Sequence, residues 1–179
     1  MKIACSKPKI KAAFAALLTT EPFEKITVAQ IVSQAEINRG TFYLHYSDKY
    51  ALAEELSHET LQQLSEITTN YTGSDNQLLS TEGIHQLLHY LRENRNTLQA
   101  LLFGGTDRSF GDAFKALLLQ NIQINESPLP EIYLREMLVA HFMSIIILWL
   151  KRNTKESIAE IADLLETGRM SDEWHHLYH

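Results

Sequence analysis

The sequence NRGTFYLHYSDK, residues 38–49, combines residue types that read nucleic acid with residue types that form a core. A guanidinium group such as that of Arg39 can donate two hydrogen bonds to a guanine edge, and a carboxamide such as that of Asn38 can address an adenine edge. A tyrosine such as Tyr43 offers a hydroxyl to a phosphate and a ring to a thymine methyl group. This combination predicts a surface that meets DNA.

The residues around this tract predict three helices that would position it. Apolar residues recur at helical spacing over residues 10–18, which predicts an amphipathic helix. The sequence TVAQ at residues 27–30 fits a capping box and predicts a second helix from Val28 to about Ala35. Asn38 is a favourable N-cap for a third helix, from Arg39 to about His45. Two short helices joined by a tight turn and braced by a first helix form a helix-turn-helix unit.

Helical phase divides the third helix into an inner and an outer face. Phe42 and Tyr46 are expected in the core, whereas the side chains near the start of the helix are expected in the major groove. Gly40 would permit a close approach to DNA, and Lys49 would contact a phosphate. The complete set of predicted DNA-contacting residues is Thr27, Asn38, Arg39, Gly40, Thr41, Tyr43, His45 and Lys49.

The charge distribution supports a basic module joined to an acidic one. The net charge of −6 by itself argues against nucleic-acid binding. Residues 1–49, however, contain seven Lys/Arg and four Asp/Glu, whereas the remaining 130 residues contain nine basic and eighteen acidic groups. Such an asymmetry favours contact of the N-terminal part with phosphates.

Residues 28–56, VAQIVSQAEINRGTFYLHYSDKYALAEEL, resemble the DNA-binding domain of the tetracycline-repressor (TetR) family. The family pattern is matched in order by Arg39, Gly40, Thr41, Phe42, Tyr43, Tyr46, Lys49 and Leu52. The resemblance implies a transcriptional regulator that binds a palindromic DNA operator as a homodimer, with repression as the default and an unknown small-molecule effector. Two residues depart from the pattern: Glu36 stands where the turn usually has Gly, and Asn38 where Ser is common. If the turn needs a left-handed residue, Glu36 costs about 1 kcal/mol relative to Gly.

The remaining sequence predicts an all-α chain. A long helix from Asp48 to about Tyr71, capped by Ser47, would leave the DNA-binding module, and a last helix would follow Thr154 as its N-cap. Further helices are predicted over residues 83–95, 98–103, 110–124 and 131–150. The fold class is therefore an N-terminal three-helix helix-turn-helix DNA-binding domain, residues 1–49, followed by a C-terminal helical effector-binding and dimerisation domain, residues 50–179.

Two sets of apolar residues in the C-terminal part suggest further sites. The segment of residues 139–150 is apolar on nearly all sides, so we expect its helix and the next one to pair with a second copy as a four-helix bundle. The predicted dimer interface comprises Ile145, Ile146, Trp149, Ile158, Ile161 and Leu165. The TetR resemblance implies an effector cavity, for which we predict Leu64, Tyr90, Phe103, Phe110, Phe114, Leu117 and Met143, although such stripes more often form plain core.

Other function classes find less support in the sequence. Cys5 is the single cysteine, which fits a reducing cytoplasm. The most apolar window spans 12 residues, short of the roughly 20 that a membrane span needs. His85 and His89 have chelating spacing but lack a clear third ligand, even with His141, so a metal site or an enzyme ranks last and no cofactor is expected. A co-regulator that keeps the helix-turn-helix shape and acts mainly through a protein partner remains an alternative.

Overall fold

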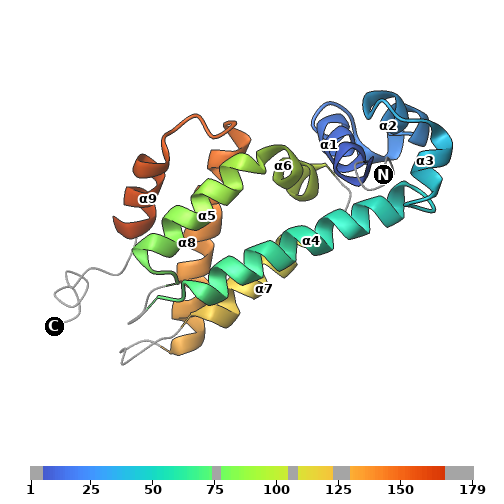
Figure 1. Cartoon of the computed structure of the whole chain (residues 1–179). Coiled ribbons are helices and arrows are strands. Elements are labelled where there is room, and N and C mark those ends of the chain that lie inside the picture. Colours follow the sequence, from blue (N-terminus) through green and yellow to red (C-terminus); the bar gives the residue numbers. More distant parts are fainter. Residues whose placement is uncertain (1–5, 74–77, 105–108, 123–129, 168–179) are drawn as a thin grey trace, which may run out of the picture. The chain divides into compact units, whose positions relative to one another are not determined.

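The structure is a computed structural model that describes residues 6–73, 78–104, 109–122 and 130–167 (Figure 1). The described residues contain helices and no strand, apart from an isolated bridge between Thr72 and Leu79. The chain is all-α, as the sequence predicts. By internal contacts it divides into two compact units, one from residues 1–62 and 96–111 and the other from residues 63–95 and 112–179.

The first unit contains the helix-turn-helix (blue to cyan in Figure 1). Its elements are α1 (Ser6–Leu18), the 3-10 helix η1 (Phe23–Lys25), α2 (Val28–Gln34), α3 (Arg39–Tyr43), the start of α4 (Lys49–Asn70) and most of α6 (Arg95–Phe103). Its core is formed by fully buried side chains that include Ile10, Phe14, Ile31, Phe42 and Leu52. The amide of Phe23 donates to the carbonyl of Gly104, 3.4 Å away, which ties the end of α6 to η1.

The second unit contains the end of α4 and the C-terminal helices. These are α5 (Thr81–Glu93), α7 (Phe110–Asn121), α8 (Glu131–Lys151) and α9 (Ile158–Thr167), and α9 packs on both α5 and α8. The side chain of Asn121 donates to the hydroxyl of Thr68 at 3.3 Å, which joins α7 to the end of α4. The α5 helix starts so close to the end of α4 that a Cβ at Gly83 would lie 2.5 Å from the Cβ of Tyr71, and only glycine fits there.

Two helix starts differ from the sequence-based prediction. Ser47 is not the cap of α4: the Asp48 carboxylate accepts from the amides of Tyr50 and Ala51, each at 2.9 Å. The last helix starts at Ile158 rather than after Thr154, because Thr154 has a positive φ of 51° and belongs to the turn that ends α8. The cap of α9 is a reciprocal pair, in which Ser157 Oγ accepts from the amide of Glu160 and the Glu160 carboxylate accepts from the amide of Ser157.

Candidate nucleic-acid interface

The turn between α2 and α3 is a Schellman motif with Glu36 as its left-handed residue. The amide of Ile37 donates to the carbonyl of Val32 at 3.0 Å, and the amide of Glu36 donates to that of Ser33 at 3.2 Å. Glu36 has a φ of 55°, the region in which an L-residue pays a steric penalty and glycine does not. The turn therefore adopts the backbone that the sequence led us to expect, with glutamate in place of glycine.

Both short helices are capped by residues that we predicted as DNA contacts. Thr27 and Gln30 form the predicted capping box: Thr27 Oγ1 accepts from the Gln30 amide, and the Gln30 carboxamide accepts from the Thr27 amide. Asn38 Oδ1 accepts from both the amide and the hydroxyl of Thr41, at 2.8 and 3.0 Å. A bidentate adenine contact needs this carboxamide oxygen as an acceptor, so capping uses the atom with which Asn38 was expected to read a base.

The α3 helix separates its rings into a buried and an exposed set. Phe42 is fully buried and Tyr46 is 3% exposed, and their ring centroids lie 5.7 Å apart. Tyr43, one residue beyond Phe42, is 48% exposed. The guanidinium of Arg39 lies 5.8 Å from the centroid of the Tyr43 ring, within the range of a cation–π contact, and both residues face solvent. The outer face of α3 thus presents a paired cation and ring, with Gly40 exposed beside them.

His45 and Lys49 both have partners inside the first unit. Ser6 Oγ lies 2.6 Å from His45 Nε2, which joins the start of α1 to the end of the recognition region. The Lys49 ammonium donates to the carbonyls of Phe23, Glu24 and Ile26, at 2.7, 3.1 and 2.8 Å. An ammonium has three N–H donors and all three are used here. The structure therefore gives Lys49 a structural role within the unit, and its phosphate contact stays a prediction.

Two further basic residues of the N-terminal part, Lys7 and Lys11, form a network of ion pairs between α1 and α4. Glu55 forms ion pairs with Lys7 at 3.0 Å and with Lys11 at 2.7 Å, and Lys11 also pairs with Glu59 at 2.5 Å. Burial by itself would raise the pKa of Glu55, but hydrogen bonds from Lys11, Lys7 and Tyr46 lower it to about 2. Burial by itself would lower the pKa of Lys11, but its two carboxylate partners raise it.

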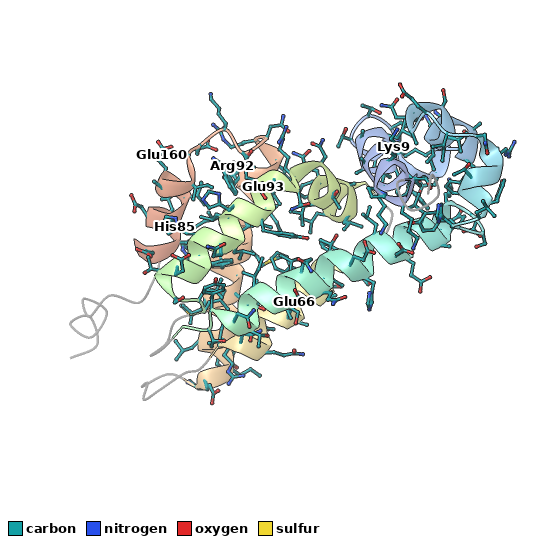
Figure 2. The ribbon with its side chains drawn as sticks, viewed as in Figure 1. Lys9, Glu66, His85, Arg92, Glu93 and Glu160 are labelled. Atoms are coloured by element: carbon teal, nitrogen blue, oxygen red, sulfur yellow. The ribbon has the colours of Figure 1, made fainter. Side chains whose placement is uncertain are left out.

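The same network affects Tyr46 and the cations that remain. Burial raises the pKa of the Tyr46 hydroxyl, and the hydrogen bond to Glu55 raises it further. Within the described part of the chain, the exposed cations of the helix-turn-helix that take part in no such network are Lys9, which Figure 2 labels on α1, Lys25 on η1 and Arg39 on α3.

Two family models match the chain over separate regions. Residues 10–56 match "Bacterial regulatory proteins, tetR family", and this region contains most of α1, the capped turn and α3. Residues 80–168 match "Transcriptional regulator C-terminal region". The chain belongs to the TetR family of transcriptional regulators. Its helix-turn-helix thus lies in the region that matches the model of tetR-family regulatory proteins.

Similar proteins agree with this assignment to the TetR family. The chain is 25% identical over 157 residues to the uncharacterized HTH-type transcriptional regulator YxbF of Bacillus subtilis (strain 168), a match that covers 85% of this chain but 41% of that relative. A TetR transcriptional regulator from Streptococcus agalactiae 2603V has a similar structure, with a TM-score of 0.64, 24% identity and coverage of 94% and 96% of the two chains. The dihydroxyacetone kinase operon activator DhaS also has this fold, with a TM-score of 0.62, 21% identity and coverage of 92% and 96%.

The residues predicted for dimerisation of this TetR protein are largely buried within a single chain. Ile146, Trp149, Ile158, Ile161 and Leu165 are all less than 9% exposed within a single chain, and Ile145 is half-buried. The Trp149 indole also donates to the carbonyl of Glu156 at 3.1 Å, inside the α8–α9 connection. These side chains form the core of the second unit because α9 covers that face of α8.

The large exposed apolar residues of α8 and α9 form a different set, which the predicted interface does not include. They are Ile132, Tyr133, Met137, Leu148 and Leu164, each between 51% and 68% exposed. Residues 133, 137, 144 and 148 fall at helical spacing on α8, and Ser144 is exposed as well. Both faces of α8 carry large apolar side chains, and α9 packs against the inner one.

The predicted effector residues are divided between the two compact units. Phe103 and Phe110 belong to the first unit, where Phe103 is 42% exposed and Phe110 is fully buried. Leu64, Tyr90, Phe114, Leu117 and Met143 belong to the second unit, where Leu64 and Phe114 are fully buried, Met143 is 9% exposed and the other two are half-buried. Within the second unit these side chains lie on four different helices, α4, α5, α7 and α8.

Two further features bear on other kinds of site. An open cleft of about 320 Å³ lies in the first unit, between the alanine-rich face of α1 and the end of α2, with Lys9 and Glu36 among its lining residues. Figure 2 labels His85 on α5. In the ranges that the structure describes, no three His, Cys, Asp or Glu side chains are grouped so as to hold a metal ion.

Proposed function

We propose that the chain binds a palindromic operator as a homodimer, with the outer face of α3 in the major groove of each half-site. The observation that carries this proposal is the exposed Arg39–Tyr43 pair on α3, backed by the buried rings of Phe42 and Tyr46. Arg39 would donate two hydrogen bonds to a guanine edge, and the hydroxyl of Tyr43 would contact a phosphate. Thr27, Asn38, Thr41, His45 and Lys49 support these contacts by shaping the domain, because their polar groups are already hydrogen-bonded within it.

The second copy would pack against the uncovered face of α8 and α9. This α8–α9 face is defined by Tyr133, Met137, Leu148 and Leu164, which together expose a large apolar surface on a single chain. Large apolar side chains that are exposed at helical spacing on one helix favour an interaction site. A C2 dimer would cover the same residues on both copies. The two α3 helices would then read half-sites about one helical turn of DNA apart.

The length and apolar character of α8 also meet the criteria for a membrane span, but we propose a cytoplasmic protein with no membrane contact. Residues 131–151 qualify by length and composition, and 28% of the most apolar stretch is buried within the chain. We attribute the exposed remainder of this stretch to contact with a second copy of the chain, and not to contact with lipid. The helix lies inside the region that matches a C-terminal model of transcriptional regulators. Its first two turns also carry Glu131, Arg135 and Glu136, which a lipid environment would disfavour.

A small-molecule effector remains part of the proposal and is assigned to the second unit. Leu64, Phe114 and Met143 provide buried apolar contacts from three helices, and Tyr90 adds a hydroxyl. Binding there would bias the α4 helix, which continues from the second unit into the DNA-binding unit. Repression follows if the bound dimer occludes a promoter, although one protein with this fold is named an operon activator.

A co-regulator that acts mainly through a protein partner is the second candidate. The observation in its favour is electrostatic: Lys7, Lys11 and Lys49 are engaged within the domain, and the acidic Glu36 lies in the turn before α3. Fewer cations are therefore left for phosphates than the sequence count suggests.

Selection of bound fragments from sheared genomic DNA, followed by hydroxyl-radical footprinting, separates the two candidates. The regulator should protect two patches centred about one helical turn apart, and the binding constant should fall steeply with salt. Light scattering on the same sample should give the mass of a dimer. Recovery of no enriched sequence in repeated selections would refute direct operator binding and favour the co-regulator.

A further inference from the structure

The most exposed large apolar side chain of the recognition region is Leu44, a residue with no polar group. It is 69% exposed, more than Tyr43 and more than any other large apolar side chain in the first unit. Exposed leucine at this level costs hydration free energy that a polar residue would avoid. Contact with a partner would remove the Leu44 side chain from water and recover this free energy.

Helical phase places Leu44 directly opposite the buried side of the recognition region. The helical turn continues past the end of α3, because the amide of Leu44 donates to the carbonyl of Gly40 at 3.1 Å and that of Tyr46 to the carbonyl of Phe42 at 3.0 Å. Leu44 stands two residues from each of the buried rings Phe42 and Tyr46. At roughly 100° per residue it lies about 200° from both. By the same count, Gly40 and Thr41 lie on either side of Leu44, and Tyr43 lies about 100° away from it.

The backbone before Leu44 leaves room for a small apolar group. Side chains in a helix lean toward its N-terminus, so Leu44 leans over the position of Gly40, one turn earlier. A Cβ added at Gly40 would meet only the Asn38 side chain, at 3.3 Å. Beside Leu44, the absent side chain of Gly40 therefore leaves space for a small group.

We propose that Leu44 reads a thymine in each half-site by packing on its 5-methyl group. The proposal rests on the proposed operator binding, because it concerns the face of α3 that would enter the major groove. The thymine methyl is the one apolar group that a base pair presents there. Leu44 points away from the core of the unit and would therefore approach the base edges in the groove. Its apolar side chain would gain free energy there by packing on such a methyl group.

Uracil scanning tests this inference with the full-length chain. Each thymine of the selected operator is replaced in turn by deoxyuridine, which removes only the methyl group, and dissociation constants are measured by fluorescence anisotropy for the wild type, Leu44→Ala and Leu44→Met. Loss of one buried methyl contact corresponds to about a three- to fivefold weaker complex. In the wild type, one thymine per half-site should show this effect, and Leu44→Ala should abolish it at that thymine alone. Leu44→Met keeps an apolar side chain of similar length and should retain it.

The possible results separate this inference from the proposed function. Suppose that the operator is bound specifically, but that each uracil substitution changes the dissociation constant equally for the wild type and for Leu44→Ala. The inference is then wrong, and operator binding stands. The inference also fails if Leu44→Ala changes the mass in light scattering, since Leu44 would then contact protein. If no DNA sequence is bound specifically, both proposals fail together. Because Leu44 is exposed, an unchanged circular dichroism spectrum is expected for both variants.

Discussion

Replacing Lys49 with methionine distinguishes a structural role of this residue from a phosphate contact. Its ammonium donates to three carbonyls around η1 and lies 4.5 Å from the centroid of the Phe23 ring. A hydrogen bond from a charged donor contributes about 1.5–3 kcal/mol when buried. Lys49 is half-buried and its carbonyl partners can be rehydrated, so about 1 kcal/mol per bond is the better scale. The lost cation–π contact adds about 0.5–1 kcal/mol.

We therefore expect Lys49→Met to lower the free energy of unfolding of the helix-turn-helix by about 3–4 kcal/mol, because methionine keeps part of the aliphatic packing but has no donor and no charge. Urea unfolding followed by circular dichroism measures the loss, and hydrogen exchange by mass spectrometry should place the new opening at residues 23–26. Lys25→Met is the matched control, because this neighbouring lysine is exposed, and its effect should stay within about 0.5 kcal/mol.

The opposite pattern would refute the structural role. If Lys49→Met leaves the unfolding curve unchanged and instead lowers the slope of operator affinity against salt by about one counterion, Lys49 contacts a phosphate. The position of the Lys49 ammonium favours the structural role. It sits in the first turn of α4, where the helix dipole disfavours positive charge, and the three carbonyls offset that cost.

Three further perturbations test other parts of the structure. Glu36→Gly should stabilise the helix-turn-helix by about 0.5–1 kcal/mol in urea unfolding because the residue has a positive φ, whereas Glu36→Ala, which removes the charge but keeps the strain, should not; equal effects would deny the role of strain. Leu148→Glu should convert the dimer to monomers in light scattering, with Glu166→Gln as a charge-changing control outside the α8–α9 face, and an unchanged mass would rule this face out. The pKa of Glu55 is lowered from 4.5 to about 2, so its contribution to stability is complete above about pH 4.5 and is lost as the pH falls toward 2. After allowance for solvent screening this contribution is about 1–2 kcal/mol, so Glu55→Gln should be less stable than the wild type by that amount at pH 7 and equal to it near pH 2; a pH-independent difference would contradict the assignment.

The helix-turn-helix was predictable from sequence because its signals are local. The capping box of Thr27 and Gln30 and the cap at Asn38 depend on residues three positions apart, and both are present. The same reasoning applies to Ser157 and Glu160, whose spacing matches a capping box and which the prediction passed over in favour of Thr154. That error was avoidable.

The roles of side chains that depend on distant segments were not predictable in this way. Lys49 meets carbonyls 23–26 residues earlier in the chain, and His45 meets a serine 39 residues away. A single sequence gives no sign that these groups converge. The burial of the predicted dimer residues was not predictable for another reason: residues 139–150 are almost all apolar, so periodicity could not tell the face of α8 that α9 covers from the face that stays exposed.

The most direct test of the account is the affinity of the full-length chain and of Arg39→Ala for the selected operator across a range of salt concentrations. Specific binding should weaken steeply with salt, and Arg39→Ala should reduce it at least tenfold, because a bidentate guanine contact contributes about 1–3 kcal/mol in each half-site. Binding to unrelated DNA should change far less. An operator affinity that is the same for both proteins would contradict the assignment of α3 as the reading element.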